Sequence, residues 1–308
     1  MDKKIRCVIS GLFYPLSMMS YFIRALERRD DVELFLVGPY TGDWIPWGGG
    51  NGMRLPFKYV KTPNIPLPRE LAQQVGLAPS FIESRLPWKP DLWLQIDAGW
   101  WLQRPDAGVV AHIATDPHVL DYDKQRGQCD YFFNMQRSYM KEGDIHLPYA
   151  FDPTVHRPLD IKKEYDGCLV GLQYETRTQL VRALRGAGYS IEYSIGAVYD
   201  EFNVLYNKSR VALNWSSLLD LNARAFEAMG MGIPLLTNRI PALDEFFEEG
   251  QHYEGFSSIP EAVDRFENLM EDDEHFTADY LARTAYEEVI EKHTYDHRIQ
   301  QILDTVFE

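Results

Sequence analysis

Short apolar runs alternate with amphipathic stretches through the first half of the chain. The run 4–11 is typical of a buried strand, and the helical spacing of Phe22, Ala25 and Leu26 predicts a helix over 16–30. Further apolar runs predict strands at 31–38, 91–98, 108–116 and 129–135. Strands that alternate with helices in this way predict a doubly wound α/β domain. The glycines after Trp47 predict a flexible loop, and the Pro-rich stretch 62–90 predicts a loop or lid.

A second alternating set follows a segment with three prolines and a charge cluster, residues 147–167, which predicts a linker. Strands are predicted at 167–171, 190–196, 211–216 and 234–238, and helices at 177–188, 201–210, 222–232 and 242–250. From Ile259 onward almost the whole chain has a helical pattern. We therefore predict two Rossmann-like domains, residues 1–150 and 151–285, and a terminal helix, residues 286–308, that packs back toward the first domain.

Open α/β sheets bind ligands at the carboxyl ends of their strands, so two such domains predict a central cleft that both of them face. A dinucleotide site would need Gly-x-Gly-x-x-Gly after the first strand, but this chain reads Ser-Gly-Leu-Phe-Tyr-Pro-Leu-Ser there. The lysine motif of a phosphate-binding P-loop is missing from the sequence as well. Both absences count against hydride transfer and ATP hydrolysis.

The composition, 45% hydrophobic and 25% charged, is that of an ordinary globular protein. No run of about 18 apolar residues occurs, which predicts no membrane span, and residues 1–13 read as a first strand rather than a signal peptide. Cys7, Cys129 and Cys168 are far apart and form no metal-ligand spacing, so we expect free thiols in a reducing, cytoplasmic compartment. The net charge of −15 counts against broad electrostatic binding to nucleic acid.

The segment 222–238, NARAFEAMGMGIPLLTN, carries the main candidate chemistry. Asn222 is predicted to cap a helix through its side-chain oxygen, and Gly232 to end that helix in a left-handed conformation. The first amides and the helix dipole favour an anion, and the guanidinium group of Arg224 suits phosphate oxygens. Glu227, one turn later, can accept hydrogen bonds from the vicinal hydroxyls of a ribose. The competing interpretation is a surface ion pair between Arg224 and Glu227.

This segment resembles the donor-site motif of GT-B glycosyltransferases, particularly the CgeB-like, spore-maturation-type group related to glycosyltransferase group 1. Four further stretches resemble the same family: LPYAFDPTVHRPL, YDGCLVGLQYETRTQLVRAL, SRVALNWSS and HTYDHRIQQIL. The resemblance covers about residues 146–308, and before it only the alternation and Thr-Asp-Pro-His-Val at 115–119 correspond. It implies a GT-B fold, a nucleoside-diphosphate sugar as co-substrate, and no other cofactor.

The resemblance also implies roles for single residues. Glu227 would hold the ribose, the helix start at Asn222, Ala223 and Arg224 would hold the diphosphate, and Arg177 would be a second diphosphate contact. Many group 1 members carry another glutamate near the sugar hydroxyls, eight positions before the ribose glutamate. Leu219 stands at that place here, and either Asp220 beside it is the substitute or the sugar is held differently, so the identity of the donor and retention of the anomeric configuration stay open.

The candidates in the first half follow a predicted strand. Asp116 and His118 are candidate catalytic residues, because an acid or histidine there could orient an acceptor hydroxyl or take its proton. The family tends to have a similar Asp-x-Pro-like turn at this place. The alternative is that Asp116 only caps a turn before Pro117 and that His118 is merely exposed. His112 is a candidate acceptor contact, and Gly11 either admits the acceptor or sugar or serves a tight turn alone.

The sequence thus favours a glycosyltransferase that acts on an unidentified hydroxyl-bearing acceptor: a glycan, a protein, a small molecule or, less readily, modified DNA. No metal site is predicted, because neither His-Glu-x-x-His nor the spacing of a calcium loop occurs. Three alternatives stay open: a phage-type transferase acting on DNA bases, a non-catalytic protein that binds a nucleotide sugar, and a structural role in a coat or spore surface. Salt-sensitive DNA binding would identify the first, and slow donor hydrolysis would count against the second.

Overall fold

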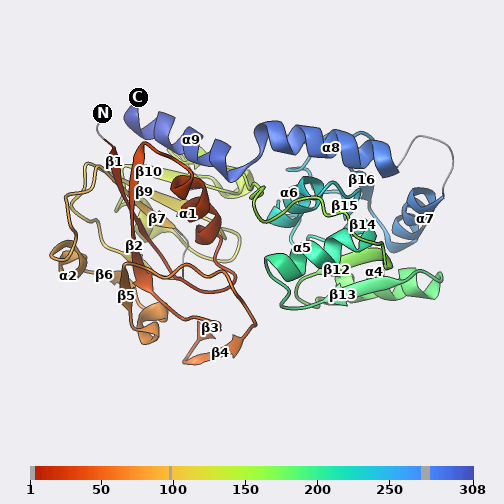
Figure 1. The fold of residues 1–308 in the computed structure, drawn as a ribbon, viewed down its shortest axis with the longest axis horizontal. Helices are drawn as coiled ribbons and strands as arrows, with labels where there is room; N and C mark the ends of the chain where they lie inside the picture. The colour runs from red at the N-terminus through yellow and green to blue at the C-terminus, as the bar shows by residue number, and fades with distance from the viewer. Residues whose placement is uncertain (1–3, 97–98, 272–277) are drawn as a thin grey trace. The chain divides into compact units, whose positions relative to one another are not determined.

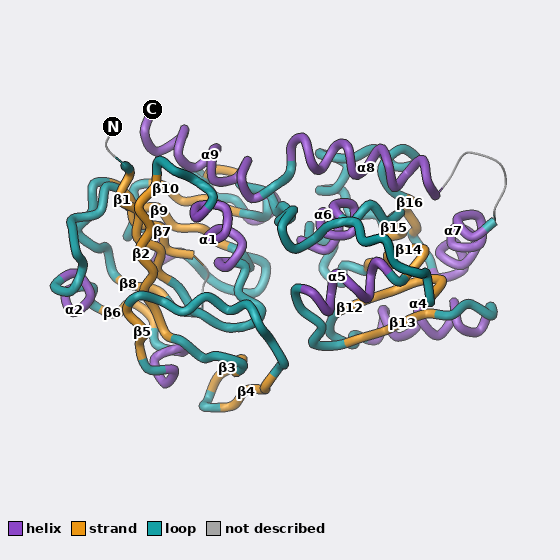
Figure 2. Tube along the Cα trace, in the orientation of Figure 1, coloured by secondary structure: helices purple, strands orange, loops and turns teal. Residues whose placement is uncertain are grey.

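The computed structural model describes residues 4–96, 99–271 and 278–308 (Figure 1). The chain divides into two compact units, the first formed by residues 1–148 and 295–308 and the second by residues 149–294. Each unit is built around its own parallel sheet, with helices on its faces (Figure 2).

Within the described residues, the sheet of the first unit has the strand order β11-β10-β9-β7-β1-β2-β5, with every neighbouring pair parallel. The strands are β1 (Ile5–Ser10), β2 (Val32–Pro39), β5 (Ile65–Leu67), β7 (Leu92–Ile96), β9 (Val109–Ala114), β10 (Tyr131–Asn134) and β11 (Ile145–His146). Every residue of β7 is buried, as expected of a central parallel strand covered on both faces. In β7, Trp93 is fully buried and donates from its indole to Ser10 (2.8 Å).

Two helices from opposite ends of the sequence pack together in the first unit: α1 (Met19–Glu27) and α9 (Tyr295–Phe307) (Figure 1). The rings of Tyr21 and Tyr295 stack with centroids 5.1 Å apart. The guanidinium group of Arg28 donates to both carboxylate oxygens of Asp296 (2.9 and 2.8 Å). The terminal helix that belongs to this unit therefore begins at Tyr295, whereas residue 286 lies inside the preceding helix, α8 (Ala278–Lys292).

Several short elements lie where the sequence predicted loops. The glycines after Trp47 turn an antiparallel hairpin of β3 (Trp44–Gly48) and β4 (Asn51–Arg54), where the sequence predicted a loop without strands. Gly48, Gly49 and Gly50 adopt positive φ angles of 111°, 57° and 79°, which explains why glycines were needed there. The remaining short elements are η1 (Arg69–Gln73), β6 (Val75–Leu77), α2 (Ser80–Glu83), β8 (Trp101–Leu102), α3 (Asp123–Arg126) and η2 (Arg137–Tyr139).

The sheet of the second unit has the order β13-β12-β14-β15-β16 in the described chain, again with parallel neighbours. Its strands are β12 (Tyr165–Val170), β13 (Ile191–Ser194), β14 (Ser209–Asn214), β15 (Leu235–Asn238) and β16 (Glu254–Phe256). Its helices are α4 (Glu175–Gly186), α5 (Asp200–Asn207), α6 (Ala223–Gly230), α7 (Ile259–Met270) and α8. Leu169, Leu213, Leu236 and Phe266 are fully buried in the core between sheet and helices.

The segment 242–250 is not the helix that its pattern predicts. It forms consecutive turns, with the amides of Phe246 and Phe247 both donating to the carbonyl of Leu243. Polar contacts hold it in this shape: Tyr253 donates to Asp244, and the guanidinium group of Arg239 pairs with both carboxylate oxygens of Glu249 (2.9 and 2.7 Å). These tertiary contacts outweigh the local helical propensity of the segment.

Candidate functional site

Two helices of the second unit begin just after the carboxyl ends of neighbouring strands. The helix α4 follows β12, and α6 follows β14. Because β12 pairs with β14 in parallel, with Cys168 opposite Ala212, the carboxyl ends of the two strands adjoin. The amino ends of both helices therefore begin at the edge of the sheet where α/β proteins bind ligands.

Each of these helices places an arginine in its first turn. Arg177 is buried, with 8% of the residue's surface exposed. It donates to the carbonyl oxygens of Trp215 (2.9 Å) and Leu172 (3.0 Å). Arg224 donates from Nη1 to the side-chain oxygen of Asn214 at the end of β14 (2.7 Å). Both guanidinium groups are thus directed to the sheet edge, away from the outer helix surface.

The two guanidinium groups converge on Gly171, the residue that follows β12. A Cβ atom on this glycine would lie 2.6 Å from Nη2 of Arg224 and 3.2 Å from Nη1 of Arg177. Burial, together with the positive charge of Arg224, lowers the pKa of Arg177. No carboxylate forms an ion pair with either arginine in the described chain, and Nε of Arg224 is buried without a hydrogen-bond partner there. Two close cations that no described carboxylate pairs with directly favour a multivalent anion.

The amino end of α6 lacks a side-chain cap. Asn222 occupies the N-cap position with an extended backbone, but its side chain accepts no hydrogen bond from the first amides. Its Nδ2 donates to Asn214 (3.3 Å) instead, and its Oδ1 is buried with no partner among the described residues. The predicted capping bond is therefore wrong, because Asn214 holds the amide group. The first helical amides, beginning at Ala223, therefore receive no acceptor from the side chain of Asn222. They lie beside Arg224, at the positive end of the helix dipole.

Glu227 lies one turn further along α6 and is buried, with 8% of its surface exposed. Burial raises the pKa of its carboxyl to about 7, although Arg224 opposes this shift. Its Oε1 lies 3.6 Å from Nε2 of the buried His156. Within the described residues Arg224 and Glu227 form no ion pair, so the interpretation as a surface ion pair is wrong. A buried carboxylate next to an anion site requires another explanation.

The remaining donor-side candidates lie around the start and end of α6. Asp220 stands in the loop before the helix and accepts a hydrogen bond from Ser216 (2.5 Å). Its neighbour Leu219 is 57% exposed and has a φ of 56°, a left-handed conformation that costs a branched side chain about 1–2 kcal/mol. After the helix, Gly232 has a φ of 66°, which confirms its predicted left-handed conformation.

In the first unit, His112 lies in the core. It is 1% exposed, and its ring stacks on Phe132 with centroids 5.5 Å apart and planes 3° apart. Burial, with a smaller effect of Arg126, lowers its pKa to about 3, so the imidazole is neutral. The structure therefore assigns His112 a packing role, and the expected acceptor contact is not supported by its position.

Gly11 also serves packing. A Cβ atom there would lie 2.6 Å from the sulfur of Met19 and 2.7 Å from the carbonyl oxygen of Ile96. The protein's own atoms fill the space that the missing side chain leaves. The interpretation as a structural turn residue is therefore favoured over close approach of a ligand.

Asp116 and His118 lie in a turn after β9. The carbonyl of Asp116 accepts from the amides of Val119 and Leu120, and its carboxylate accepts from Thr115 (3.1 Å). Nδ1 of His118 is buried without a hydrogen-bond partner in the described part of the chain. A pocket of about 300 Å³ begins at this turn and is lined by Pro117, Val119, Leu120, Asp121, Tyr122, Arg126, Tyr139 and Lys141.

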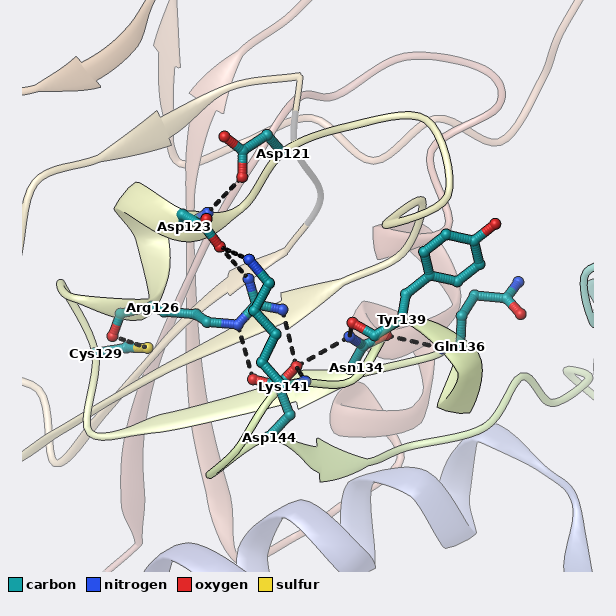
Figure 3. A network of polar contacts seen from close by, with 9 residues as sticks. All are labelled: Asp121, Asp123, Arg126, Cys129, Asn134, Gln136, Tyr139, Lys141 and Asp144. Atoms are coloured by element: carbon teal, nitrogen blue, oxygen red, sulfur yellow. Dashed lines mark hydrogen bonds and ion pairs between the residues drawn. The ribbon is translucent and has the colours of Figure 1, made fainter.

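Some residues that line this pocket, among them Arg126 and Lys141, belong to a network of polar contacts (Figure 3). The guanidinium group of Arg126 donates to both oxygens of Asp144 (2.8 Å each) and to Asp123 (2.9 Å). Lys141 donates to the same oxygen of Asp123 (2.5 Å). Asn134 at the end of β10 also donates to Asp144 (3.1 Å). Because carboxylates already neutralise both cations, this pocket does not favour an anion.

Comparison with known proteins supports a class of enzyme. Residues 155–304 match the model of a family described as glycosyl transferase-like. Anabaena HepE, solved in complex with UDP and glucose, is similar over 98% of this chain and 99% of that chain, with a TM-score of 0.64 and 11% identity. Sucrose-phosphate synthase from Thermosynechococcus elongatus covers 99% of both chains, with a TM-score of 0.59 and 12% identity. The chain matches none of the curated proteins compared.

A third similar structure belongs to another class of enzyme. A putative UDP-N-acetylglucosamine 2-epimerase from Listeria monocytogenes is similar over 97% of this chain and 95% of that chain, with a TM-score of 0.55 and 12% identity. Together these likenesses show that the chain has the GT-B fold, built from two Rossmann-like units, as the sequence predicted. The family match, with this fold, supports glycosyl transfer. The CgeB-like subgroup stays a prediction.

Two further observations concern partners and metals. None of the helices in the described ranges is long and apolar enough to cross a bilayer. In those same ranges, no group of three or more His, Cys, Asp or Glu side chains is arranged to hold a metal ion.

Sequence reasoning missed three residues that shape the site: Gly171, Asn214 and His156. Gly171 follows a strand and precedes an arginine-bearing helix, a pattern that could have indicated close approach at the strand end. His156 gave no local signal, because its partner Glu227 is far away in the sequence, and nothing in the pattern around Asn214 showed that its side chain turns toward α6.

Proposed function

We propose that the protein transfers a sugar from a nucleoside-diphosphate sugar to a hydroxyl-bearing acceptor. The observation that carries this proposal is the convergence of Arg177 and Arg224 on Gly171, with no described carboxylate in ion-pair distance of either. The amino end of α6 adds its positive dipole at the same place. A diphosphate supplies the multiple negative charge that this arrangement favours.

In this proposal the acceptor oxygen forms a bond to the anomeric carbon of the sugar, the bond between that carbon and the diphosphate oxygen breaks, and the nucleoside diphosphate leaves. Negative charge then develops on the diphosphate, and Arg177, Arg224 and the amides that begin at Ala223 stabilise it. Glu227 accepts hydrogen bonds from the ribose hydroxyls and so positions the nucleotide. Asn222 and Asp220, which flank the helix start, complete the donor side. The nucleotide sugar is the co-substrate, and no other cofactor is proposed.

The acceptor side is proposed to lie at the turn after β9. The carboxylate of Asp116 would take the proton of the attacking hydroxyl, and His118 would orient that hydroxyl. The adjoining pocket offers the exposed apolar side chains of Val119, Leu120 and Tyr139. A cytoplasmic location and membership of the CgeB-like subgroup belong to the same proposal.

The test is a thermal-shift panel of nucleoside diphosphates and their sugars on the wild type, Glu227→Ala and Glu201→Ala. Glu201 is an exposed glutamate on α5 and serves as the matched control. A ligand at a hundred times its Kd should stabilise the wild type and the control by about 2.7 kcal/mol. Glu227→Ala should lose most of this effect. A panel without any shift in the wild type at millimolar ligand would overturn the proposal.

The likeness to an epimerase makes a second readout necessary. Incubation of the protein with the nucleotide sugar that binds, followed by analysis of the sugar, separates the reactions. Release of nucleoside diphosphate with transfer to an added acceptor or to water supports the transferase. Inversion at a sugar carbon with the nucleotide bond intact would indicate an epimerase, and binding with neither change would indicate a non-catalytic protein. Salt-sensitive DNA binding would bring modified DNA forward as the acceptor.

A further inference from the structure

The segment 151–159 presses against α6 at two points. A Cβ atom on Gly230 would lie 2.3 Å from the ring of Phe151, so this glycine lets the segment approach the helix closely. Three residues earlier on the helix, Oε1 of Glu227 lies 3.6 Å from Nε2 of His156. His156 is 1% exposed, so its ring is shielded from solvent.

The segment is held in this position by α5. Two buried asparagines of that helix accept hydrogen bonds from its backbone: Asn203 from the amide of Arg157 (3.0 Å) and Asn207 from the amide of Leu159 (2.8 Å). The ring of His156 also packs edge-on against Phe202, with centroids 5.6 Å apart. The imidazole therefore has a fixed place opposite the carboxylate.

The backbone also determines which ring nitrogen carries the proton. The amide of Asp152 approaches Nδ1 of His156 at 3.4 Å. An amide N–H can only donate, so Nδ1 acts as the acceptor and the proton of a neutral imidazole stands on Nε2. The N–H group therefore faces Glu227 without any need for a charged ring.

We propose that His156 is a positioning residue for the nucleotide site: its Nε2–H, 3.6 Å from Oε1 of Glu227, closes to a hydrogen bond when a nucleotide binds and leaves Oε2 for a ribose hydroxyl. This inference rests on the proposed role of Glu227. The titratable groups that face the carboxyl in the described chain are His156, Arg224 on the same helix and Tyr206 on α5. A donor fixed at Oε1 keeps a buried carboxylate ionised and holds its rotamer, and both are needed for it to accept from the ribose.

The test compares His156→Phe, which keeps the ring but removes the donor, with His156→Gln, whose amide donor reaches the place of Nε2. His252→Phe is the matched control, because Nδ1 of His252 likewise accepts from the amide four residues earlier (2.9 Å). Affinities are measured by calorimetry for the nucleoside diphosphate that binds, its 2′,3′-dideoxy counterpart and inorganic pyrophosphate, between pH 6 and 8.5.

In His156→Phe we expect the nucleoside diphosphate to bind about tenfold more weakly at neutral pH, the effect of one pKa unit on the carboxyl. The pH midpoint of its binding should move upward. Pyrophosphate and the dideoxy compound should bind as to the wild type, since neither needs Glu227. His156→Gln should restore most of the affinity, and His252→Phe should behave as the wild type.

A loss of affinity in His156→Phe that is equal for all three ligands would show a merely structural role and overturn the inference. So would wild-type affinity and an unchanged midpoint. If His156→Phe does not fold, His156→Gln decides alone: it must bind all three ligands nearly as the wild type does, and weak binding of the nucleoside diphosphate would overturn the inference. Failure of the proposed function looks different, because the wild type itself would then bind no nucleoside diphosphate.

Discussion

Arg177 and Arg224 come from the first turns of different helices, yet their guanidinium groups lie over the same glycine, Gly171. Their charges repel, and no carboxylate of the described chain lies within ion-pair distance of either guanidinium group. A protein keeps such a pair only where surrounding contacts hold it. Arg177 has those contacts in two backbone carbonyls, and Arg224 has one in Asn214.

The different bonding of the two arginines predicts different results on substitution. Arg177→Ala removes a buried guanidinium group together with its two hydrogen bonds to backbone carbonyls. It should destabilise the fold by about 2–4 kcal/mol. Arg224→Ala removes one such bond and relieves the repulsion, so it should destabilise less. Both should weaken binding of pyrophosphate by at least about tenfold, the effect of one charge-assisted hydrogen bond. Urea unfolding and calorimetry measure the two effects, and equal stability of both variants with unchanged binding would contradict this prediction.

Gly171→Ala should displace Arg224, because the new methyl group would lie 2.6 Å from its Nη2 atom. The φ angle of 150° at this glycine adds backbone strain. We expect weaker pyrophosphate binding in a folded protein. Gly186→Ala is the matched control, since a Cβ there meets no atom within 4 Å and the helical backbone accepts it. Unchanged pyrophosphate binding in Gly171→Ala would show that the two guanidinium groups do not form the anion site.

The pKa of Glu227 predicts how stability depends on pH. Its pKa is about 7 in the folded protein against 4.5 without the fold, so the folded state binds more protons between these values. The stability that protonation provides is full below pH 4.5 and is lost as pH rises through 7. The wild type should therefore lose about 3 kcal/mol relative to Glu227→Gln between pH 4.5 and pH 8. Urea unfolding of both proteins across this range checks the sign, and parallel curves would contradict it.

Asp116 and His118 should affect transfer without affecting donor binding. A general base contributes about 10²–10⁴-fold, so Asp116→Asn should lower kcat by at least about a hundredfold. His118→Gln should lower kcat less, because it orients the acceptor without taking its proton. Nucleoside-diphosphate affinity should stay at the wild-type value in both. A wild-type kcat in Asp116→Asn would show that Asp116 is not the base. A retaining reaction, which needs no base from the protein, would account for that result.

Much of the fold follows from local pattern. Continuous apolar runs such as the one in β7 can only be buried on both faces of a sheet, and their alternation with amphipathic helices indicates two parallel sheets. The pattern failed where tertiary contacts decided the conformation. The segment 242–250 forms turns because Arg239 and Tyr253, which lie outside it, hold its acidic side chains. The hairpin after Trp44 depends on three glycines at positive φ, which also suit a loop.

The sequence by itself determined which functional groups lie together on α6. An arginine and a glutamate three residues apart lie on one face of any helix, and the strand before them places that helix at the edge of the sheet. Only the tertiary structure decided what these residues do. It buried Glu227 against His156, turned Asn222 away from the helix it was expected to cap, and brought Arg177 to Arg224. It also placed His112 in the core. The physical reason is that burial, charge and hydrogen bonding depend on neighbours in space, and several of those neighbours, such as His156 for Glu227, lie far away along the chain.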